Sequence, residues 1–194
     1  MKMSETIELA VSAARQIDGW MSRDHLAWLA ESAARHQSII EVGSWKGRST
    51  KALAMATLGK VYAVDGWIGA TRKTRELIAA EGRDNIEAEF RRNLAPEISA
   101  GKVVVIPAES ADAAFALAHD RVTADMVFID AAHSYDAVKR DIALWRPFLV
   151  PGGLLCGHDY VSSWEGVIAA VDELVPNRRL QGNVSDGAIW WSLV

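Results

Sequence analysis

The chain of 194 residues is long enough for one domain with a large hydrophobic core and short for two. Half of its residues are apolar and 24% are charged, which is typical of a globular protein and excludes a disordered one. The net charge of -4, without any run of basic residues, argues against nucleic acid as a partner, because phosphate contacts need clustered lysine and arginine.

Cysteine content and hydropathy bear on where the protein works. A single cysteine, Cys156, excludes an intramolecular disulfide, and its position inside an apolar run predicts a small buried residue. No apolar stretch approaches the roughly 20 residues of a membrane-spanning helix, and the first residues lack an apolar segment of signal-peptide length. These features predict a cytoplasmic protein that has no membrane partner.

Two amphipathic helices are predicted at the start of the chain, over residues 4–18 and 22–35. In both segments the apolar residues recur three and four positions apart, and Ser22 is placed to cap the second helix. Residues 1–37 are therefore expected to form an N-terminal helical extension. It could help to build a substrate pocket, or it could pack against a second subunit in a homo-oligomer.

From residue 38 the pattern changes to short apolar runs separated by helical segments. The runs are continuously apolar, as expected for parallel strands that are covered on both faces. Five strands are predicted, at 39–42, 61–64, 103–106, 126–129 and 154–156. The helices predicted between them cover 49–58, 71–92 with a break near Gly82, 110–119 and 135–147, and a further helix follows the fifth strand.

Two extended segments near 179–184 and 188–193 close the chain, and the Ser185-Asp186-Gly187 sequence between them is typical of a hairpin turn. The fold class predicted for residues 1–194 is therefore one α/β domain. It has a doubly wound, Rossmann-like, seven-stranded and mostly parallel sheet, with a C-terminal antiparallel hairpin and two N-terminal helices.

Ligands of an open parallel sheet bind beyond the carboxyl ends of its strands. All five predicted strands end in polar residues that could bind a ligand, and these residues are Glu41, Ser44, Asp65, Glu109, Ser110, Asp130, His133, His158 and Asp159.

The first strand leads into a turn that contains Gly43 and Gly47, which allow a tight bend and a close approach to a ligand. Asp65, at the end of the second strand, can accept hydrogen bonds from both hydroxyls of a ribose. The third glycine of the dinucleotide motif is absent, and Glu41 would repel a pyrophosphate. The same carboxylate suits the cationic amino group of S-adenosylmethionine, which is therefore favoured over NAD.

Four segments, at 41–49, 61–67, 125–136 and 151–160, resemble the motifs of class I S-adenosylmethionine-dependent methyltransferases. More narrowly, they resemble the small-molecule O-methyltransferase group that includes macrolide-sugar and cephalosporin-pathway enzymes. The most specific part is the stretch Phe-Ile-Asp-Ala-Ala-His-Ser-Tyr at residues 128–135. The resemblance runs in order from about residue 38 to residue 160, and the closing hairpin fits the same fold.

The resemblance implies where each part of S-adenosylmethionine would bind. The glycine turn would hold the methionine end, the second strand end the ribose, and the third strand end the adenine. The residues are Glu41, Gly43 and Ser44 for the methionine end, Asp65 and Trp67 for the ribose and its surroundings, and Glu109 and Ser110 for the adenine. Gly47 and Ser49 are also expected to bind the cofactor.

The resemblance also implies a catalytic centre. In relatives, the carboxylate that matches Asp130 binds a divalent cation together with residues at the end of the fifth strand, here His158 and Asp159, and the residue that matches His133 is the general base. Histidine, with a pKa of about 6.5, cannot deprotonate an alcohol outright, so a Lewis-acidic cation on the same oxygen would lower the barrier. Mg²⁺ or Mn²⁺ is expected, although imidazole is a poor ligand for Mg²⁺, which makes the place of His158 open.

The sequence therefore predicts methyl transfer from S-adenosylmethionine to a hydroxyl of a small molecule, assisted by a divalent metal. Two alternatives stay open at this point. One is a protein that binds S-adenosylmethionine without catalysis, and the other is a nicotinamide-dependent oxidoreductase on a similar sheet. The identity of the acceptor is not predicted.

Overall fold

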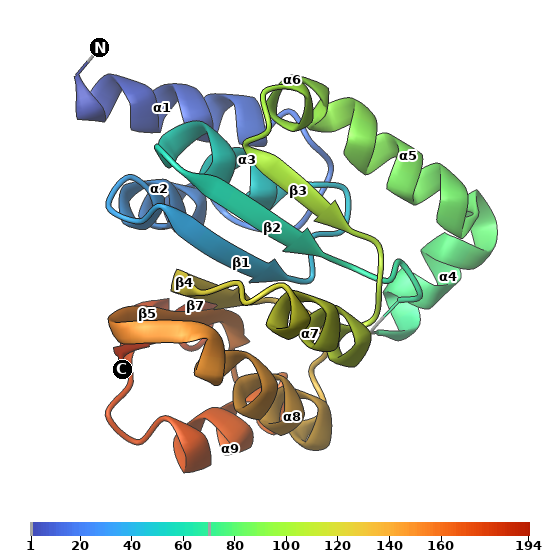
Figure 1. The fold of residues 1–194 in the computed structure, drawn as a ribbon. Helices are drawn as coiled ribbons and strands as arrows, with labels where there is room; N and C mark the ends of the chain where they lie inside the picture. Colours follow the sequence, from blue (N-terminus) through green and yellow to red (C-terminus); the bar gives the residue numbers. More distant parts are fainter. Residues whose placement is uncertain (1, 70) are drawn as a thin grey trace.

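A computed structural model describes residues 2–69 and 71–194 of the chain, and its centre is a seven-stranded sheet (Figure 1). The strand order is β3-β2-β1-β4-β5-β7-β6. All neighbours from β3 to β5 pair in parallel, and β7 pairs antiparallel with both β5 and β6. The strands are β1 (Ser38–Val42), β2 (Lys60–Val64), β3 (Val103–Ile106), β4 (Ala124–Ile129), β5 (Leu149–Tyr160), β6 (Arg179–Asn183) and β7 (Gly187–Leu193).

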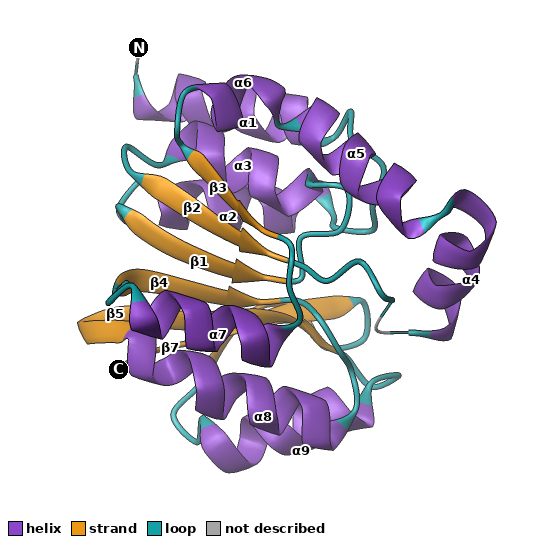
Figure 2. Cartoon of the chain, turned by 45° about the vertical axis from the view of Figure 1, so that its right-hand side comes forward, coloured by secondary structure: helices purple, strands orange, loops and turns teal. Residues whose placement is uncertain are grey.

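Helices cover both faces of the sheet (Figure 2). One layer contains α1 (Met3–Ala14), α2 (Arg23–Ala33), α3 (Arg48–Ala56), α5 (Arg83–Asn93) and α6 (Ala95–Ser99). The opposite layer contains α7 (Ser110–His119), α8 (Tyr135–Trp145), which continues as a short 3-10 helix (Arg146–Phe148), and α9 (Glu165–Leu174). Successive strand residues such as Ile39 and Ile40 are both fully buried because they point to opposite covered faces. The predicted doubly wound sheet with a C-terminal hairpin is confirmed.

The two N-terminal helices belong to the main core. Ala10 and Ala14 of α1 and Leu26 and Leu29 of α2 are completely or almost completely buried, in the same cluster as strand residues of β1, β2 and β4. Ser22 caps α2 as predicted, because its side chain accepts a hydrogen bond from the His25 N–H. The described part of the helical extension, residues 2–37, is thus an integral layer of the fold rather than an appendage.

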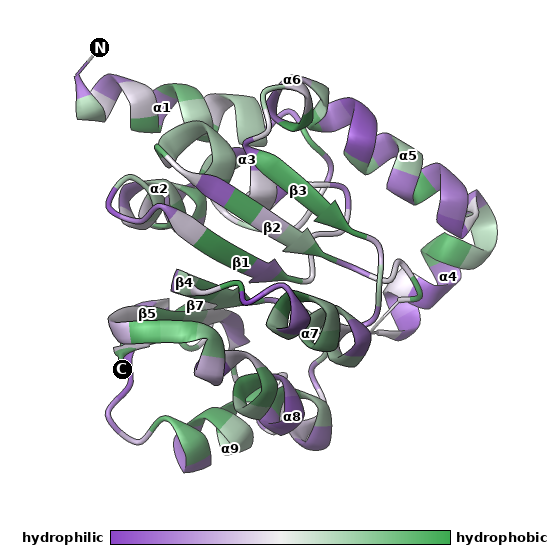
Figure 3. Ribbon diagram, viewed as in Figure 1, coloured by the Kyte–Doolittle hydropathy of each residue, from purple (hydrophilic) through white to green (hydrophobic). Residues whose placement is uncertain are grey.

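The break predicted near Gly82 in the helix over 71–92 is confirmed, because Gly82, with a φ of +90°, separates α4 (Arg72–Glu81) from α5. Two elements differ from the sequence prediction. The short helix α6 was not expected, and β5 extends from residue 149 to residue 160 rather than over 154–156 alone, because it pairs with both β4 and β7. Figure 3 shows that β3 is hydrophobic along its length while α5 is largely hydrophilic. No residue of α4 is buried.

The order in which the chain forms the strands reverses direction at β1, in the centre of the sheet. The chain runs from β1 outward to β2 and β3, then returns to β4 on the other side of β1. Such a reversal opens a crevice at the carboxyl ends of the two central strands, which is where ligands of this architecture bind. Among residues 2–69 and 71–194, no helix is long and apolar enough to cross a membrane.

Candidate active site

A cavity of about 290 Å³ opens at the carboxyl ends of β1, β2, β4 and β5. This volume lies at the lower end of the range for small-molecule sites. Most of the residues predicted from strand ends line it, and these are Gly43, Ser44, Ser49, Asp65, Glu109, Ser110, Asp130, His133, His158 and Asp159. Three predicted cofactor residues, Glu41, Gly47 and Trp67, do not line it.

Gly43 lines the cavity. The reason that a glycine is needed at this position is the backbone of Asp130 at the end of the neighbouring strand. The φ of Gly43 is +94°, and a Cβ at this position would lie 2.1 Å from the carbonyl oxygen of Asp130. The expected reason was a close approach to a ligand. The glycine instead allows the end of β1 to pack against the end of β4.

Gly47 begins α3 with a φ of +92°. A Cβ there would lie 2.2 Å from Leu94 Cδ2 and 3.1 Å from the Phe90 ring. A glycine is needed here because its missing side chain makes room for the buried apolar residues around the end of α5, and a contact of Gly47 with the ligand stays a prediction.

Glu41 lies behind the cavity wall and is fully buried. The hydroxyls of Ser44 and Thr50 donate to its Oε2, at 2.8 Å and 2.5 Å. Within the described part of the chain, Oε1 has no partner. Burial raises the pKa of this carboxyl to about 7, although the hydroxyl donors oppose the shift. Glu41 can therefore act on a ligand only through the residues in front of it, such as Ser44.

Trp67 was expected beside the ribose, but its ring lies in the core. The side chain is 1% exposed, its indole N–H donates to the carbonyl of Trp45 at 2.8 Å, and its ring packs against Phe90. The cause is local backbone geometry, because φ at Trp67 is +47° and turns the side chain away from the cavity.

Asp65 is held by three backbone N–H groups. Those of Ser44 and Trp45 donate to Oδ2 at 3.0 Å and 2.8 Å, and that of Trp67 donates to Oδ1 at 2.7 Å. Burial raises the pKa of Asp65, and these donors counteract the rise. The carboxyl thus ties the turn after β1 to the end of β2 while it faces the cavity.

The adenine end of the predicted site contains a residue that the sequence prediction missed. Asp141 of α8 lines the cavity and is almost completely buried, and it accepts a hydrogen bond from Ser110 Oγ at 2.6 Å. Trp145 Nε1 donates to the same hydroxyl at 2.9 Å. A carboxylate three residues after the apolar Val138 on a buried helical stripe was the sequence signal for Asp141.

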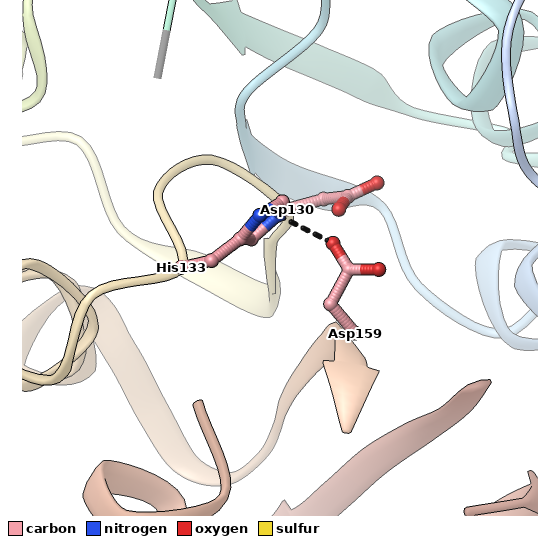
Figure 4. Close-up of side chains that lie close together, drawn as sticks. All are labelled: Asp130, His133 and Asp159. Atoms are coloured by element: carbon pink, nitrogen blue, oxygen red, sulfur yellow. Dashed lines mark ion pairs between the residues drawn. The ribbon is translucent and has the colours of Figure 1, made fainter. Parts of the chain in front are cut away.

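The predicted catalytic residues converge at the other end of the cavity (Figure 4). Asp130, His133 and Asp159 each offer a ligand atom, and these atoms lie within 4.8 Å of one another. His133 Nε2 lies 2.6 Å from Asp159 Oδ2, and the Trp164 ring packs against the imidazole at a centroid distance of 4.2 Å. His133 Nδ1 is buried, with no hydrogen-bond partner among the described residues.

The pKa values of the two carboxyls in this cluster are shifted in opposite directions. Burial raises the pKa of Asp130 to about 7, although the neighbouring His158 opposes the rise. Burial would also raise the pKa of Asp159, but hydrogen bonds from His133 and His158 outweigh it and hold that pKa below its usual range. Asp159 adopts a φ of +60°, a left-handed conformation that is costly for a non-glycine residue and clusters at functional sites.

His158 was predicted as a third metal ligand but is not in the group that could hold an ion. Its Nδ1 faces Asp159 Oδ1 at 3.1 Å, and its Nε2 lies 2.9 Å from Nδ1 of His25, so both ring nitrogens already have partners. The sequence prediction missed His25. Its signal was a histidine four residues before Leu29 on the apolar stripe of the second helix.

The loop between α1 and α2 forms part of the cavity wall through Gly19, Trp20 and Met21. Arg48 at the start of α3 holds this loop, because its guanidinium donates to the carbonyl of Gly19 at 2.8 Å. Trp20 packs on Trp45 at a centroid distance of 5.7 Å and is half exposed. The N-terminal segment therefore contributes to the pocket, as the sequence suggested.

Known structures with the same fold come from methyltransferases. The chain is similar to an O-methyltransferase from Bacillus cereus in complex with SAH, with 16% identity, a TM-score of 0.68, and coverage of 99% of this chain and 90% of that one. It is also similar to TomG, an O-methyltransferase of tomaymycin synthesis from Streptomyces achromogenes in complex with SAM, with 18% identity, a TM-score of 0.67, and coverage of 98% and 90%. None of the curated proteins searched matches the sequence.

A family model described as a methyltransferase domain matches residues 40–160, which is more than half of the chain. The match spans the glycine turn, Asp65, and the cluster of Asp130, His133 and Asp159, and it ends at the last residue of β5. The chain therefore belongs to the family that this model describes, the methyltransferase domain.

Proposed function

We propose that this protein transfers a methyl group from S-adenosylmethionine to a hydroxyl oxygen of a small molecule, with the help of a divalent cation. One observation carries the proposal. Asp130, His133 and Asp159 come together in the same cavity as Asp65 and the turn after β1. A site with this arrangement can hold a nucleoside at one end and activate a hydroxyl at the other.

The residues in the cavity fit S-adenosylmethionine. Asp65 presents a carboxyl, anchored by backbone N–H groups, that could accept from ribose hydroxyls. Ser44 would lie at the methionine end, with Glu41 behind it, and Glu109 and Ser110 at the adenine end. The solved O-methyltransferases with SAH and SAM support this choice over a nicotinamide cofactor.

The donor set also fits a divalent cation. Two carboxyls and one imidazole, with ligand atoms within 4.8 Å of one another, suit Mg²⁺ or Mn²⁺. We assign the cation to Asp130 and Asp159, because Mg²⁺ prefers carboxylates and keeps its other positions for water and substrate oxygens. His133 is then left as the general base. When bound, the cation would supply Lewis acidity to the acceptor oxygen.

The acceptor hydroxyl must lose its proton as its oxygen takes the methyl group. Nε2 of His133 faces the cluster whereas Nδ1 is buried, so Nε2 is the nitrogen that would receive this proton. In the structure Nε2 lies 2.6 Å from Asp159 Oδ2 and, because a carboxylate only accepts, carries a hydrogen there. The step therefore requires a neutral ring that carries its hydrogen on Nδ1, with Asp159 turned toward the cation. The carboxylate of Asp159 would stabilise the imidazolium that forms. The Trp164 ring, packed against the imidazole, would hold its orientation. General-base assistance of this kind contributes roughly 10²- to 10⁴-fold to rate.

The proposal is tested by a screen of hydroxylated small molecules with S-adenosylmethionine labelled on the methyl group. We expect transfer to at least one acceptor, loss of turnover with EDTA, and recovery with Mg²⁺ or Mn²⁺. His133→Ala should lower turnover by about 10²-fold or more while SAH affinity, measured by calorimetry, is kept.

Different outcomes would contradict different parts of the proposal. Tight binding of NAD without binding of SAH would refute the cofactor assignment. Binding of SAH without transfer to any acceptor would favour a binding protein without catalysis. Unchanged turnover after thorough chelation would refute the metal, and unchanged turnover of His133→Ala would refute the base.

A further inference from the structure

A histidine from the N-terminal layer contacts the catalytic cluster. His25 of α2 and His158 of β5 are 133 residues apart in the chain, yet His25 Nδ1 lies 2.9 Å from His158 Nε2. The two rings meet edge to face, with centroids 5.0 Å apart. His25 therefore links the N-terminal helical layer to the end of β5.

The position of His25 is fixed on several sides. Its backbone N–H donates to the Ser22 cap, which sets the first turn of α2. Its side chain is 8% exposed, and a Cβ added at Gly182 of β6 would lie only 2.8 Å from His25 Nε2. The ring thus lies between β5 and the terminal hairpin and has little freedom to turn.

The hydrogen-bond network assigns the protons of the pair. Nδ1 of His158 faces the carboxylate of Asp159 at 3.1 Å, and a carboxylate can only accept, so this nitrogen carries a hydrogen. In neutral His158, Nε2 then has no hydrogen and can accept a hydrogen bond. In that state the donor of this hydrogen bond is Nδ1 of His25.

Asp159 lies between two imidazoles. Its Oδ1 faces His158 Nδ1 at 3.1 Å and its Oδ2 faces His133 Nε2 at 2.6 Å. Because both oxygens of the carboxyl face imidazole nitrogens, these two contacts hold its direction, on a residue whose backbone is in a strained left-handed conformation. Whatever fixes the ring of His158 therefore also fixes the oxygen that faces His133.

We propose that His25 is a positioning residue of the methyl-transfer site, which holds one tautomer and one orientation of His158 and through it the carboxyl of Asp159. This inference rests on the proposed function insofar as Asp159 serves the acceptor and the cation. The hydrogen bond that it assigns can be observed without turnover. Outer partners of this kind typically change metal affinity by about 10- to 100-fold when removed.

The test compares two substitutions at one position in the full chain. His25→Asn keeps an amide near the place of Nδ1 that can donate to His158, and His25→Leu fills the space without a donor. His36→Leu is a matched control, because among the described residues the side chain of His36 is hydrogen-bonded only to the carbonyl of Ser32 in the same helical layer. Thermal unfolding of all variants separates general destabilisation from a local effect.

Two readouts need no acceptor. The first is the ¹⁵N NMR spectrum of the histidine rings, in which the His158 signals are identified by their loss in His158→Asn. The wild type should show hydrogen on Nδ1 of His158, His25→Asn should keep this state, and His25→Leu should give a mixture of tautomers. The second is Mn²⁺ affinity, which should fall by about 10-fold in His25→Leu and stay within about 3-fold in the other two variants.

The proposal is overturned if wild-type His158 carries its neutral-form hydrogen on Nε2, a result that depends on no variant. It is also overturned if His25→Leu folds and leaves both the His158 spectrum and Mn²⁺ affinity unchanged. Should the wild type bind no Mn²⁺, the metal in the proposed function fails, while the NMR spectra still decide the role of His25.

Discussion

Glu41 lies directly behind the cavity, where it accepts hydrogen bonds from Ser44 and Thr50. Burial raises its pKa from 4.5 to about 7, so folding favours the protonated form of this group. When folding raises the pKa of a carboxyl, the protonated group adds to the free energy of unfolding. This contribution is fully present at a pH below the pKa of the group in the unfolded chain. That contribution is lost as pH rises through the folded pKa, so the relevant window runs from about 4.5 to about 7.

Glu41→Gln should remove this pH dependence, because an amide stays neutral and can still accept from both hydroxyls. Without ligand, the free energy of unfolding of the wild type should fall relative to the variant by on the order of 3 kcal/mol across that window. Urea unfolding at pH 4.5 to 8 measures the difference. If the free energy of unfolding varied with pH in the same way in both proteins, burial would not control the protonation of Glu41. Glu76→Gln, at an exposed glutamate, is the control.

At single residues, the sequence predicted most of the cavity lining, because polar residues at parallel strand ends must meet at one edge of the sheet. It could not predict the direction of a side chain that depends on an unusual backbone angle. Trp67 turns into the core because its φ is +47°. His25 and Asp141 were missed because each lies on a helix far from the strand ends, although both stand on apolar stripes.

The helix α4 beside the cavity is held by an ion pair at its end and by the partly buried Ile78, which packs against the core. None of its residues is buried, but Glu81 at its end lies 3.1 Å from the ammonium of Lys46. The same ammonium lies 3.1 Å from Glu89 and 3.5 Å from Asp18. Lys46 therefore joins α4, α5 and the loop between α1 and α2 at one point.

Lys46→Met should loosen α4, because three carboxylates would remain together without a cation. The carboxylates are partly exposed, so we expect a cost of about 1 kcal/mol and roughly fivefold faster hydrogen exchange over residues 72–81. Lys51→Met is the control, since Lys51 pairs with Glu97 of α6. Equal exchange over α4 in the wild type and Lys46→Met would show that the ion pairs do not hold this helix.

Element boundaries were predicted best where they depend on local chemistry. The break at Gly82 and the closing hairpin follow from glycine and turn residues, and both are confirmed. The length of β5 could not be predicted, because Pro151, Gly152 and Gly153 are poor strand formers. Pairing of β5 with β4 and with β7 extends it across them.

At the scale of the whole molecule, α1 and α2 complete one face of the core, and α3 lies beneath them. We expect a chain that lacks residues 1–37 not to fold, because α3 would lose its apolar cover. Far-ultraviolet circular dichroism and urea unfolding test this expectation. Cooperative unfolding of the truncated chain at the wild-type midpoint would show that the N-terminal layer is dispensable.

The alternation of apolar runs and amphipathic helices predicted a doubly wound sheet because only covered parallel strands are apolar on both faces. The convergence of Asp130 and Asp159 follows from the adjacency of β4 and β5. The contact between His25 and His158 depends instead on how α2 packs beside the terminal hairpin. No short-range pattern in the chain encodes that packing.

The close fit of Gly43 against the carbonyl of Asp130 bears on any attempt to engineer a new acceptor. Gly43 lies in the turn on the nucleoside side of the site, and Asp130 supplies a carboxyl on the acceptor side. The backbones of these two residues are in contact. A library that randomises the pocket should keep Gly43 fixed, since any side chain there would push apart both halves of the site at once. Diversity belongs in the Gly19–Met21 loop, where the wall can change while the two strand ends keep their register.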